Sequence, residues 1–311
     1  MMKVLITGAT GFIGKNLSIR LAQKGHEVLA AGRKLEKLAD IKAKVRPIYC
    51  FVDNKDKVAS LLAEKKPGLV YHAAALIYGP REDLMRVNAL GTRNLFEACL
   101  KNNIKKIVLL SSVSAVTGND EVPLKERRPF TRQLSLWRIK NRSEKIAGEY
   151  RKKGLKIAII RPPMVYGPGE PHGLPYLVKF ITNRMLPVFG KGQNRIHMVS
   201  IDNLLDVLEM ALQHETLYEG TYFVADKEAL TMRELIFLAA ETLEAKKPFV
   251  LPEACAIILS KMPFIGRGIS SFRKDRVYSI DKLRDKLGYE PPRPARSEFK
   301  KALLSVRDKD L

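Results

Sequence analysis

Thr7-Gly8-Ala9-Thr10-Gly11-Phe12-Ile13-Gly14 directly follows the first apolar run of the chain, Lys3–Ile6, and leads into a segment with leucines at helical spacing. Its glycines have the spacing GxxGxxG. The first permits a tight turn, the second lets the backbone approach a pyrophosphate, and the third allows close packing of a helix on a strand. The start of that helix offers free N–H groups and the positive end of its dipole to an anion. We therefore predict a dinucleotide site built by Thr7, Gly8, Thr10, Gly11, Phe12, Ile13 and Gly14.

The sequence around this stretch alternates short apolar runs with helical segments. The expected strands are Lys3–Ile6, Glu27–Ala31, Arg46–Phe51, Gly68–His72, Lys106–Leu110 and Leu155–Ile160. Strands that read as continuous apolar runs between helices are typical of a parallel sheet covered on both faces. The fold class we predict is α/β, with a Rossmann-type doubly wound parallel sheet over residues 1–163.

After Arg161 the alternation ends in turn-rich sequence, Arg161-Pro162-Pro163 and Gly167-Pro168-Gly169. Helices are expected at 173–184, 203–212, 231–244, 253–262 and 296–306, with short strands such as Gly220–Val224 between them. Residues 164–311 are therefore predicted to form mainly a smaller, irregular α+β substrate cap. Segments near 198–225 are expected to return to the first domain.

The composition limits the class of protein. Apolar residues make up 46% and charged residues 28% of the 311 positions, which suits a globular chain. No apolar stretch approaches the ~20 residues that a membrane-spanning helix needs. Met1-Met2-Lys3 runs straight into a strand, so no signal peptide is expected. The three cysteines have neither disulfide-framework nor metal-ligand spacing, and we expect a soluble, cytoplasmic protein without a metal site.

The charge is strongly positive. The 55 Lys and Arg against 33 Asp and Glu give a formal net charge of +22. Residues 101–161 alone hold 16 basic and five acidic residues. Such a surface attracts phosphates, nucleic acid, acidic proteins or anionic membranes without specificity, although a solvated basic surface explains the charge equally simply.

The end of the second strand indicates which cofactor binds. An NAD site places Asp or Glu there to bind the ribose 2′-hydroxyl, whereas an Arg accommodates the 2′-phosphate of NADP. This chain reads Ala30-Ala31-Gly32-Arg33-Lys34, with two cations and no acid. NADP is therefore favoured, with NAD as the alternative if Arg33 and Lys34 are merely solvated.

These residues together resemble the extended short-chain dehydrogenases/reductases, the NAD-dependent epimerase/dehydratase family. Further matching segments are Val52-Asp53, His72-Ala73-Ala74, Val87-Asn88, Gly91-Thr92 and Arg161–Gly169. Tyr222–Asp226 and Ser279–Tyr289 look most like the 3β-hydroxysteroid dehydrogenase/dihydroflavonol reductase branch. The resemblance implies that Asp53 borders the adenine and that the cofactor site also includes Ala73, Ala74, Ala75, Asn88, Ser111, Lys140, Pro162 and Val165. It also implies a homodimer formed by helices at about 84–101 and 137–153.

The catalytic positions depart from the family, whose chemistry uses a Tyr-x-x-x-Lys helix with a Ser or Thr from the loop after the fifth strand. The spacing Lys140…Glu144 matches the family and puts Leu136 where the tyrosine belongs. Counting back from Gly118 puts Val113 at the Ser/Thr position. Leucine and valine side chains have no proton to donate. The resemblance still implies that Lys140 contacts the nicotinamide ribose.

Other groups then become candidates for the proton donor. Ser112 and Ser114 flank Val113, and Tyr166 lies in the segment that resembles the family's nicotinamide-side loop. With Lys140, these three residues form the catalytic set that we predict. The weaker candidates are Tyr78, His172 and His197, while the second Tyr-x-x-x-Lys, Tyr278…Lys282, reads as a coincidence of the C-terminal segment.

Three functions compete on this sequence. The first is an NADP(H)-dependent oxidoreductase or epimerase/dehydratase with an altered acid/base, acting on a hydroxyl or carbonyl substrate. The second is a catalytically degenerate dinucleotide-binding sensor or assembly subunit, which the paired loss at Leu136 and Val113 supports. The third is an RNA- or polyanion-binding protein, but residues 101–161 hold only Phe130 and Trp137 as Phe or Trp for base stacking.

Overall fold

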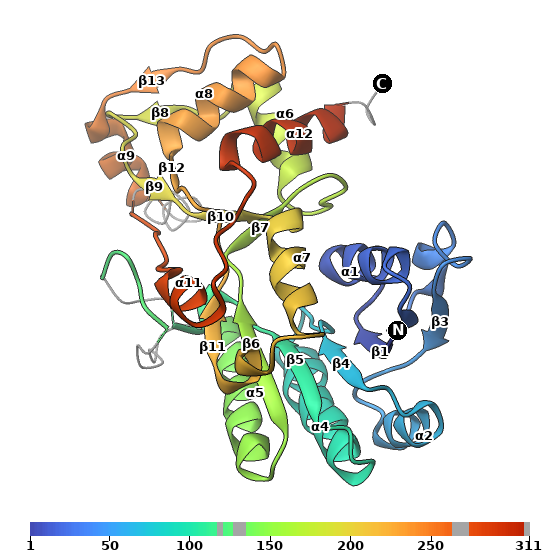
Figure 1. Cartoon of the computed structure of the whole chain (residues 1–311). Helices are drawn as coiled ribbons and strands as arrows, with labels where there is room; N and C mark the ends of the chain where they lie inside the picture. Colours follow the sequence, from blue (N-terminus) through green and yellow to red (C-terminus); the bar gives the residue numbers. More distant parts are fainter. Residues whose placement is uncertain (117–120, 127–134, 263–273, 308–311) are drawn as a thin grey trace.

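The computed structural model describes residues 1–116, 121–126, 135–262 and 274–307, with the backbone alone described for 135–140 (Figure 1). Its centre is a seven-stranded sheet in the order β11-β6-β5-β4-β1-β2-β3. Every neighbouring pair in this sheet is parallel. The strands are β1 Lys3–Thr7, β2 Glu27–Gly32, β3 Arg46–Tyr49, β4 Leu69–His72, β5 Lys106–Leu110, β6 Lys156–Arg161 and β11 Thr221–Phe223. The predicted Rossmann-type parallel sheet is confirmed.

Helices cover both faces of the sheet, which explains why its inner strands are mostly apolar. Within β1, Val4 and Ile6 join one core and Leu5 joins the other. The first core packs against α1 Phe12–Gln23 and α7 Ile201–Met210. The second packs against α2 Lys55–Lys65, α4 Gly91–Lys101 and α5 Ser135–Lys152. Between β4 and α4 run α3 Arg81–Met85 and a π-helix, Arg86–Leu90.

Side-chain caps set where several helices begin. The Asn54 side chain accepts a hydrogen bond from the backbone N–H of Lys57 at the start of α2. Ser200 does the same for Asn203 at the start of α7. Such caps satisfy N–H groups that have no partner within the helix. Short 3₁₀ turns complete the connections, at Leu35–Leu38, Val113–Val116 and Glu215–Glu219.

The cap is built from three two-stranded sheets and several helices around its own core. The paired strands are β7 Met164–Tyr166 with β10 Met198–Ser200, β9 Arg195–Ile196 with β12 Leu230–Thr231, and β8 Val188–Phe189 with β13 Val250–Leu251. Its helices are α6 Leu174–Thr182, α8 Met232–Thr242, α9 Glu253–Ser260 and α12 Ala295–Arg307, and α11 Asp281–Leu287 lies near β11. Within the described residues, no helix combines the length and apolar character needed to cross a bilayer.

Candidate functional site

The glycine turn lies at the carboxyl end of β1, where close packing leaves no space for side chains. Gly8 has φ +74°, and a Cβ there would lie 2.6 Å from the backbone nitrogen of Ala74. A Cβ on Gly14 would lie 2.3 Å from the carbonyl oxygen of Gly8. Helix α1 starts at Gly11 without a side-chain cap and has no acid in its first turn. Its first N–H groups are therefore available to an anion.

The segment after β2 supplies the cations that the sequence singled out. A Cβ on Gly32 would lie 2.5 Å from the side chain of Thr10, so this strand end packs directly on the glycine turn. Arg33 and Lys34 follow at once and are exposed. Within the described part of the chain, no carboxylate lies within ion-pair distance of either residue. Both side chains are thus free to meet an anionic ligand at the edge of this turn.

Asp53 is held from two sides, near the carboxyl end of β3. Its carboxylate accepts an ion-pair contact from Nε of Arg86 at 3.2 Å. Nδ2 of Asn94 donates to the carbonyl oxygens of Val52 and Asp53, each at 3.2 Å. The backbone beside the predicted adenine position is therefore fixed by α4 and the π-helix.

A buried hydrogen-bond chain runs beneath the carboxyl end of β4. The Thr92 hydroxyl donates to the carbonyl oxygen of Asn88 at 2.6 Å, so it must accept from Nε2 of His72, 3.0 Å away. Nδ1 of His72 lies 2.7 Å from the hydroxyl of Thr7. This chain of hydrogen bonds ties the glycine turn of β1 to β4 and α4.

Asn88 occupies the π-helix, and its side chain clamps the loop after β4. Its Oδ1 accepts from the N–H of Leu76 at 2.7 Å, and its Nδ2 donates to the Leu76 carbonyl at 2.8 Å. The π-turn is closed by the N–H of Gly91, which donates to the carbonyl of Arg86. The Asn88 carbonyl also accepts from the Ser143 hydroxyl of α5 at 2.7 Å. One residue therefore joins α5, α4 and the loop that holds Ala73, Ala74 and Ala75.

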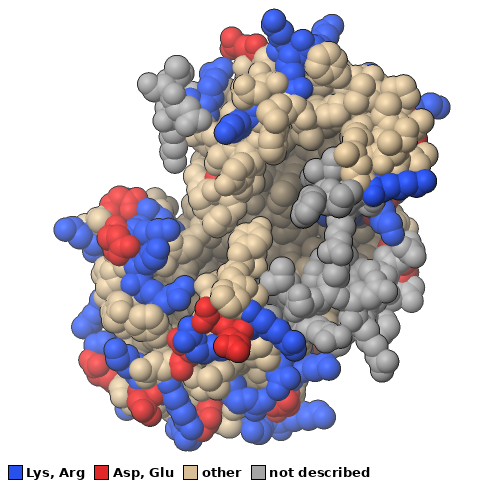
Figure 2. All heavy atoms as spheres, turned by 180° about the vertical axis from the view of Figure 1, so that it is seen from behind, with Lys and Arg blue, Asp and Glu red and all other residues tan. Residues whose placement is uncertain are grey.

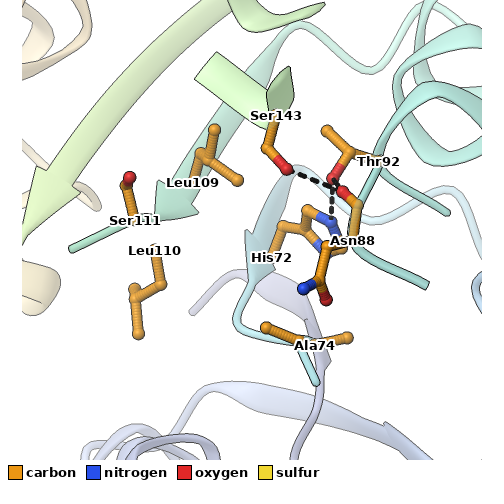
Figure 3. A pocket seen from close by; sticks show the side chains of 9 residues that line it. His72, Ala74, Asn88, Thr92, Leu109, Leu110, Ser111 and Ser143 are labelled. Carbon is orange, nitrogen blue, oxygen red and sulfur yellow. Dashed lines mark hydrogen bonds between the residues drawn. The ribbon is translucent and has the colours of Figure 1, made fainter. Parts of the chain in front are cut away.

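These groups surround a pocket at the carboxyl ends of β4 and β5 (Figure 3). It is lined by His72, Ala74, Ala75, Asn88, Thr92, Leu109, Leu110, Ser111 and Ser143. The lining contains no Asp, Glu, Lys or Arg. Carboxyl ends of parallel strands are where open α/β sheets bind their ligands. The structure thus brings the predicted residues Ala74, Ala75, Asn88 and Ser111 together.

A buried ion pair fixes α5 against the sheet. Nε of Arg161 donates to Oε1 of Glu144 at 2.9 Å, and Nη2 of Arg161 donates to Oε2 of Glu144 at 2.5 Å. Both side chains are almost fully buried. The Ser111 hydroxyl donates to the same carboxylate. Sequence reasoning used Glu144 only for register and did not assign these partners. The pair locks the register of α5 where the predicted catalytic positions lie.

Leu136 and Lys140 fall in the first turns of α5, and their side chains lie outside the described residues. The backbone places positions 136, 140 and 144 one helical turn apart along a single stripe. Val113 begins the 3₁₀ turn after β5 and is 7% exposed among apolar neighbours. Ser112 and Ser114 are half-buried beside it, and the Ser114 N–H donates to the Ser112 hydroxyl at 3.2 Å.

The structure gives the Tyr166 hydroxyl a buried carboxylate partner. The Tyr166 side chain is 1% exposed, and its hydroxyl donates to Oδ2 of Asp226 at 2.6 Å. Burial, and then the nearby Asp226 carboxylate, raise the pKa of the Tyr166 phenol far above its usual value. Tyr166 therefore holds the cap to the segment after β11, a partner 60 residues away that no local pattern reveals.

The remaining candidates from the cap also have structural partners. Nδ1 of His197 accepts from the N–H of Tyr278 at 3.2 Å, and its Nε2 lies 2.6 Å from the carbonyl of Asp226. Burial lowers the pKa of His197, in agreement with a neutral ring. Nζ of Lys282 donates to the carbonyl of Thr221 at 2.8 Å and lies over the Tyr222 ring. Tyr278 and Lys282 thus contact different groups among the described residues.

Known proteins share this architecture. The model of the NAD dependent epimerase/dehydratase family matches residues 4–225. A 2-alkyl-3-oxoalkanoate reductase of Stenotrophomonas maltophilia is 29% identical, covering 76% of this chain and 74% of its own. A UDP-glucose 4-epimerase of Mycolicibacterium smegmatis is 31% identical, covering 68% and 73%. Among solved structures, UDP-glucuronic acid 4-epimerase of Bacillus cereus in complex with NAD superposes with a TM-score of 0.81 at 20% identity, covering 99% of both chains.

Proposed function

Because the chain belongs to the NAD dependent epimerase/dehydratase family, we propose that it is an NADP(H)-dependent oxidoreductase or epimerase/dehydratase acting on a hydroxyl or carbonyl substrate, with an altered acid/base. The observation that carries this proposal is the glycine turn, packed without room for a Cβ at Gly8 or Gly14. Two exposed cations, Arg33 and Lys34, follow β2 and have no carboxylate in ion-pair distance among the described residues. A reduced cofactor bound there supplies hydride to a carbonyl carbon. The chain's own residues must position the substrate and deliver the proton.

The proposed tasks divide among a few residues. The turn at 8–14 and the start of α1 hold the pyrophosphate, and Asp53 borders the adenine. Lys140 binds the nicotinamide ribose, and Pro162 and Val165 line the nicotinamide side. The hydroxyls of Ser112 and Ser114 orient the substrate oxygen, since Val113 has none. Tyr166 is left out of this set because its hydroxyl is bonded to Asp226.

We predict that NADPH binds about ten- to a hundredfold more tightly than NADH. The 2′-phosphate gains charge-assisted hydrogen bonds from Arg33 and Lys34, worth on the order of 1.5–3 kcal/mol. Fluorescence titration of both reduced cofactors measures the ratio. Arg33→Ala should remove most of it, whereas Arg46→Ala, an exposed arginine at the amino end of β3, should leave it unchanged. Equal affinities in the unaltered protein would contradict the assignment.

Turnover tests the chemistry itself. NADPH oxidation is followed with ketones and flavanonols, and formation of the epimer, which consumes no net cofactor, is followed with nucleotide sugars, because the relatives include reductases of oxoalkanoates and epimerases of nucleotide sugars. We expect one of these classes to be turned over. Tight NADPH binding without turnover of any class would instead support the second candidate, a dinucleotide-binding sensor or assembly subunit. The buried Val113 and the leucine at position 136 are the observations that favour that alternative.

The basic stretch at 101–161 gives less support to a polyanion-binding function. Lys106 and Lys156 both pair with Glu215, an acid from outside that stretch. Lys101 pairs with Glu97 at 3.0 Å. Part of the positive charge is therefore compensated within the fold, as in an ordinary solvated surface.

We predict a homodimer formed through α4 and α5. Arg93 and Glu149 join these helices on their outer side at 3.0 Å. The same side exposes Arg142, Lys145 and Lys152, which would face their own copies across a twofold axis. Salt screens this repulsion, so light scattering should show more dimer at high than at low ionic strength. A monomeric mass at every salt concentration would contradict the prediction.

A further inference from the structure

One end of the cap leaves large apolar side chains in contact with solvent. They come from the end of α6, the turn after it, β13 and α9. We call this surface the cap face; its apolar members are Phe180, Met185, Phe249, Val250, Ile257 and Ile258, each between 40% and 66% exposed. Exposed apolar patches of this kind mark surfaces that bind a partner or a membrane.

The elements that carry the cap face are in contact with one another. The Arg184 guanidinium lies 4.0 Å from the centre of the Phe249 ring and joins the end of α6 to the segment before β13. The N–H of Val188 in β8 donates to the carbonyl of Phe249 at 2.8 Å. A Cβ on Gly190 would lie 2.6 Å from the Glu253 carboxylate, so the first turn of α9 sits directly on the turn after β8.

Helix α9 is the clearest anomaly of this surface. Its sequence, EACAIILS over Glu253–Ser260, is strongly apolar, yet Ala256 is the single residue that it buries. A helix of such composition ordinarily packs most of its surface into a core. Ile258 is instead 66% exposed and Ile257 45%. Among the residues that the structure describes, none covers these two side chains.

Cations surround the apolar residues. Lys179, Arg184, Lys246, Lys247 and Lys261 are all exposed, and within the described residues none has a carboxylate in ion-pair distance. The neighbouring acid Glu244 is paired with Arg307. Figure 2 shows the cap largely covered by uncharged atoms, with Lys and Arg at the margins. Apolar side chains ringed by lysines are the pattern of proteins that lie in a membrane interface.

We propose that the cap face docks on a bilayer surface that contains anionic lipids. The aliphatic side chains of α9 and β13 enter the boundary between headgroups and acyl chains, while the surrounding lysines meet lipid phosphates and carboxylates. A second copy of this chain is a poorer occupant, because the formal net charge of +22 makes two such faces repel. Lipid headgroups are mobile and can adapt to lysine side chains that have no fixed position.

Flotation of the full-length protein with vesicles tests the docking. We expect binding to phosphatidylcholine vesicles that contain phosphatidylserine, and at least tenfold weaker binding to phosphatidylcholine alone. Each lysine near an anionic surface contributes about a fivefold gain in affinity, so Lys246→Ser/Lys247→Ser should weaken binding about 30-fold. Ile257→Ser/Ile258→Ser should weaken it at least tenfold, because transfer of aliphatic surface from water is lost.

Matched variants separate docking from general stickiness. Lys42→Ser/Lys44→Ser removes the same charge from an exposed segment before β3, and Tyr49→Ser removes an exposed ring from β3. Both should bind vesicles as the unaltered protein does. Thermal unfolding followed by circular dichroism confirms that each variant is folded. Because all these positions are exposed, the four variants should melt together.

Several outcomes would overturn the proposal. One is an absence of binding to vesicles that contain phosphatidylserine. Another is that Lys246→Ser/Lys247→Ser and Lys42→Ser/Lys44→Ser weaken vesicle binding equally, which would show general electrostatic attraction. A third is vesicle binding that the isoleucine pair leaves unchanged. Retention on polyglutamate with the same lysine dependence and no isoleucine dependence would assign the surface to acidic proteins instead.

Discussion

Leu136→Tyr is expected to raise carbonyl reduction by about 10²- to 10⁴-fold, the contribution of a positioned general acid. Position 136 lies one turn before position 140 in the continuous helix α5. A phenol placed there would have the ammonium of Lys140 as its neighbour along the helix, and a nearby positive charge lowers the pKa of a phenol. The new tyrosine can then exchange a proton with the substrate oxygen as hydride moves. NADPH oxidation with the substrate panel measures the change.

The matched control is Leu136→Phe, which adds the ring without the hydroxyl and should leave the rate unchanged. Val113→Ser added to Leu136→Tyr should increase the rate more than additively, because both hydroxyls bind one substrate oxygen. Val113 is 7% exposed among apolar neighbours, so Val113→Ser would leave unfilled space. Val113→Thr, which adds a hydroxyl and keeps the side-chain volume, is therefore tested beside it. Lys140→Ala should weaken NADPH binding in the natural protein. Flat activity with Leu136→Tyr would direct the search to Tyr78, Ser112 and Ser114.

Glu144→Gln is expected to lower the free energy of unfolding by about 3–5 kcal/mol, as when one partner of a buried ion pair is removed. Arg161 would remain charged and almost fully buried without its carboxylate, and Arg161 and the Ser111 hydroxyl would share one neutral amide oxygen as acceptor. Urea unfolding followed by circular dichroism measures the change.

The same helix offers a control for this substitution. Glu149 pairs with Arg93 across exposed surface, so Glu149→Gln should cost under about 1 kcal/mol. Glu144→Gln combined with Arg161→Met should recover part of the loss, since no unpaired charge stays buried. A cost for Glu144→Gln no larger than that for Glu149→Gln would show that the pair does not fix α5.

The nucleotide domain could be predicted because its signals are local. The apolar runs of β1, β2, β4, β5 and β6 belong to strands buried on both faces, and the glycine turn lies directly between β1 and α1. The five helices expected after residue 163 are present as α6, α7, α8, α9 and α12. Helix α11 was missed because its seven residues are mostly charged and carry little apolar periodicity.

The parts of the site that could not be predicted depend on partners far away in sequence. Tyr166 seemed chemically available until the fold placed Asp226 against its hydroxyl. Glu144 gave the register of a helix, but its pairing with Arg161 requires β6 beside α5. The roles of Leu136, Lys140, Ser112 and Ser114 stay predictions. Likewise, the sequence Val87-Asn88 does not predict a π-helix. The Ser143 hydroxyl that donates to the Asn88 carbonyl belongs to another helix, α5.

The π-helix Arg86–Leu90 is equivalent to the insertion of one residue into a continuous helix that runs from α3 into α4. An α-helix turns by about 100° per residue. Deleting Ala89 or Leu90 would therefore restore a continuous α-helix and rotate everything before the deletion by about that angle. Asn88 would then face away from Leu76, and the loop after β4 would lose both of its side-chain clamps. The shape of the pocket lined by Asn88 thus depends on residue count as much as on residue identity, and a change in length here would be more damaging than most substitutions.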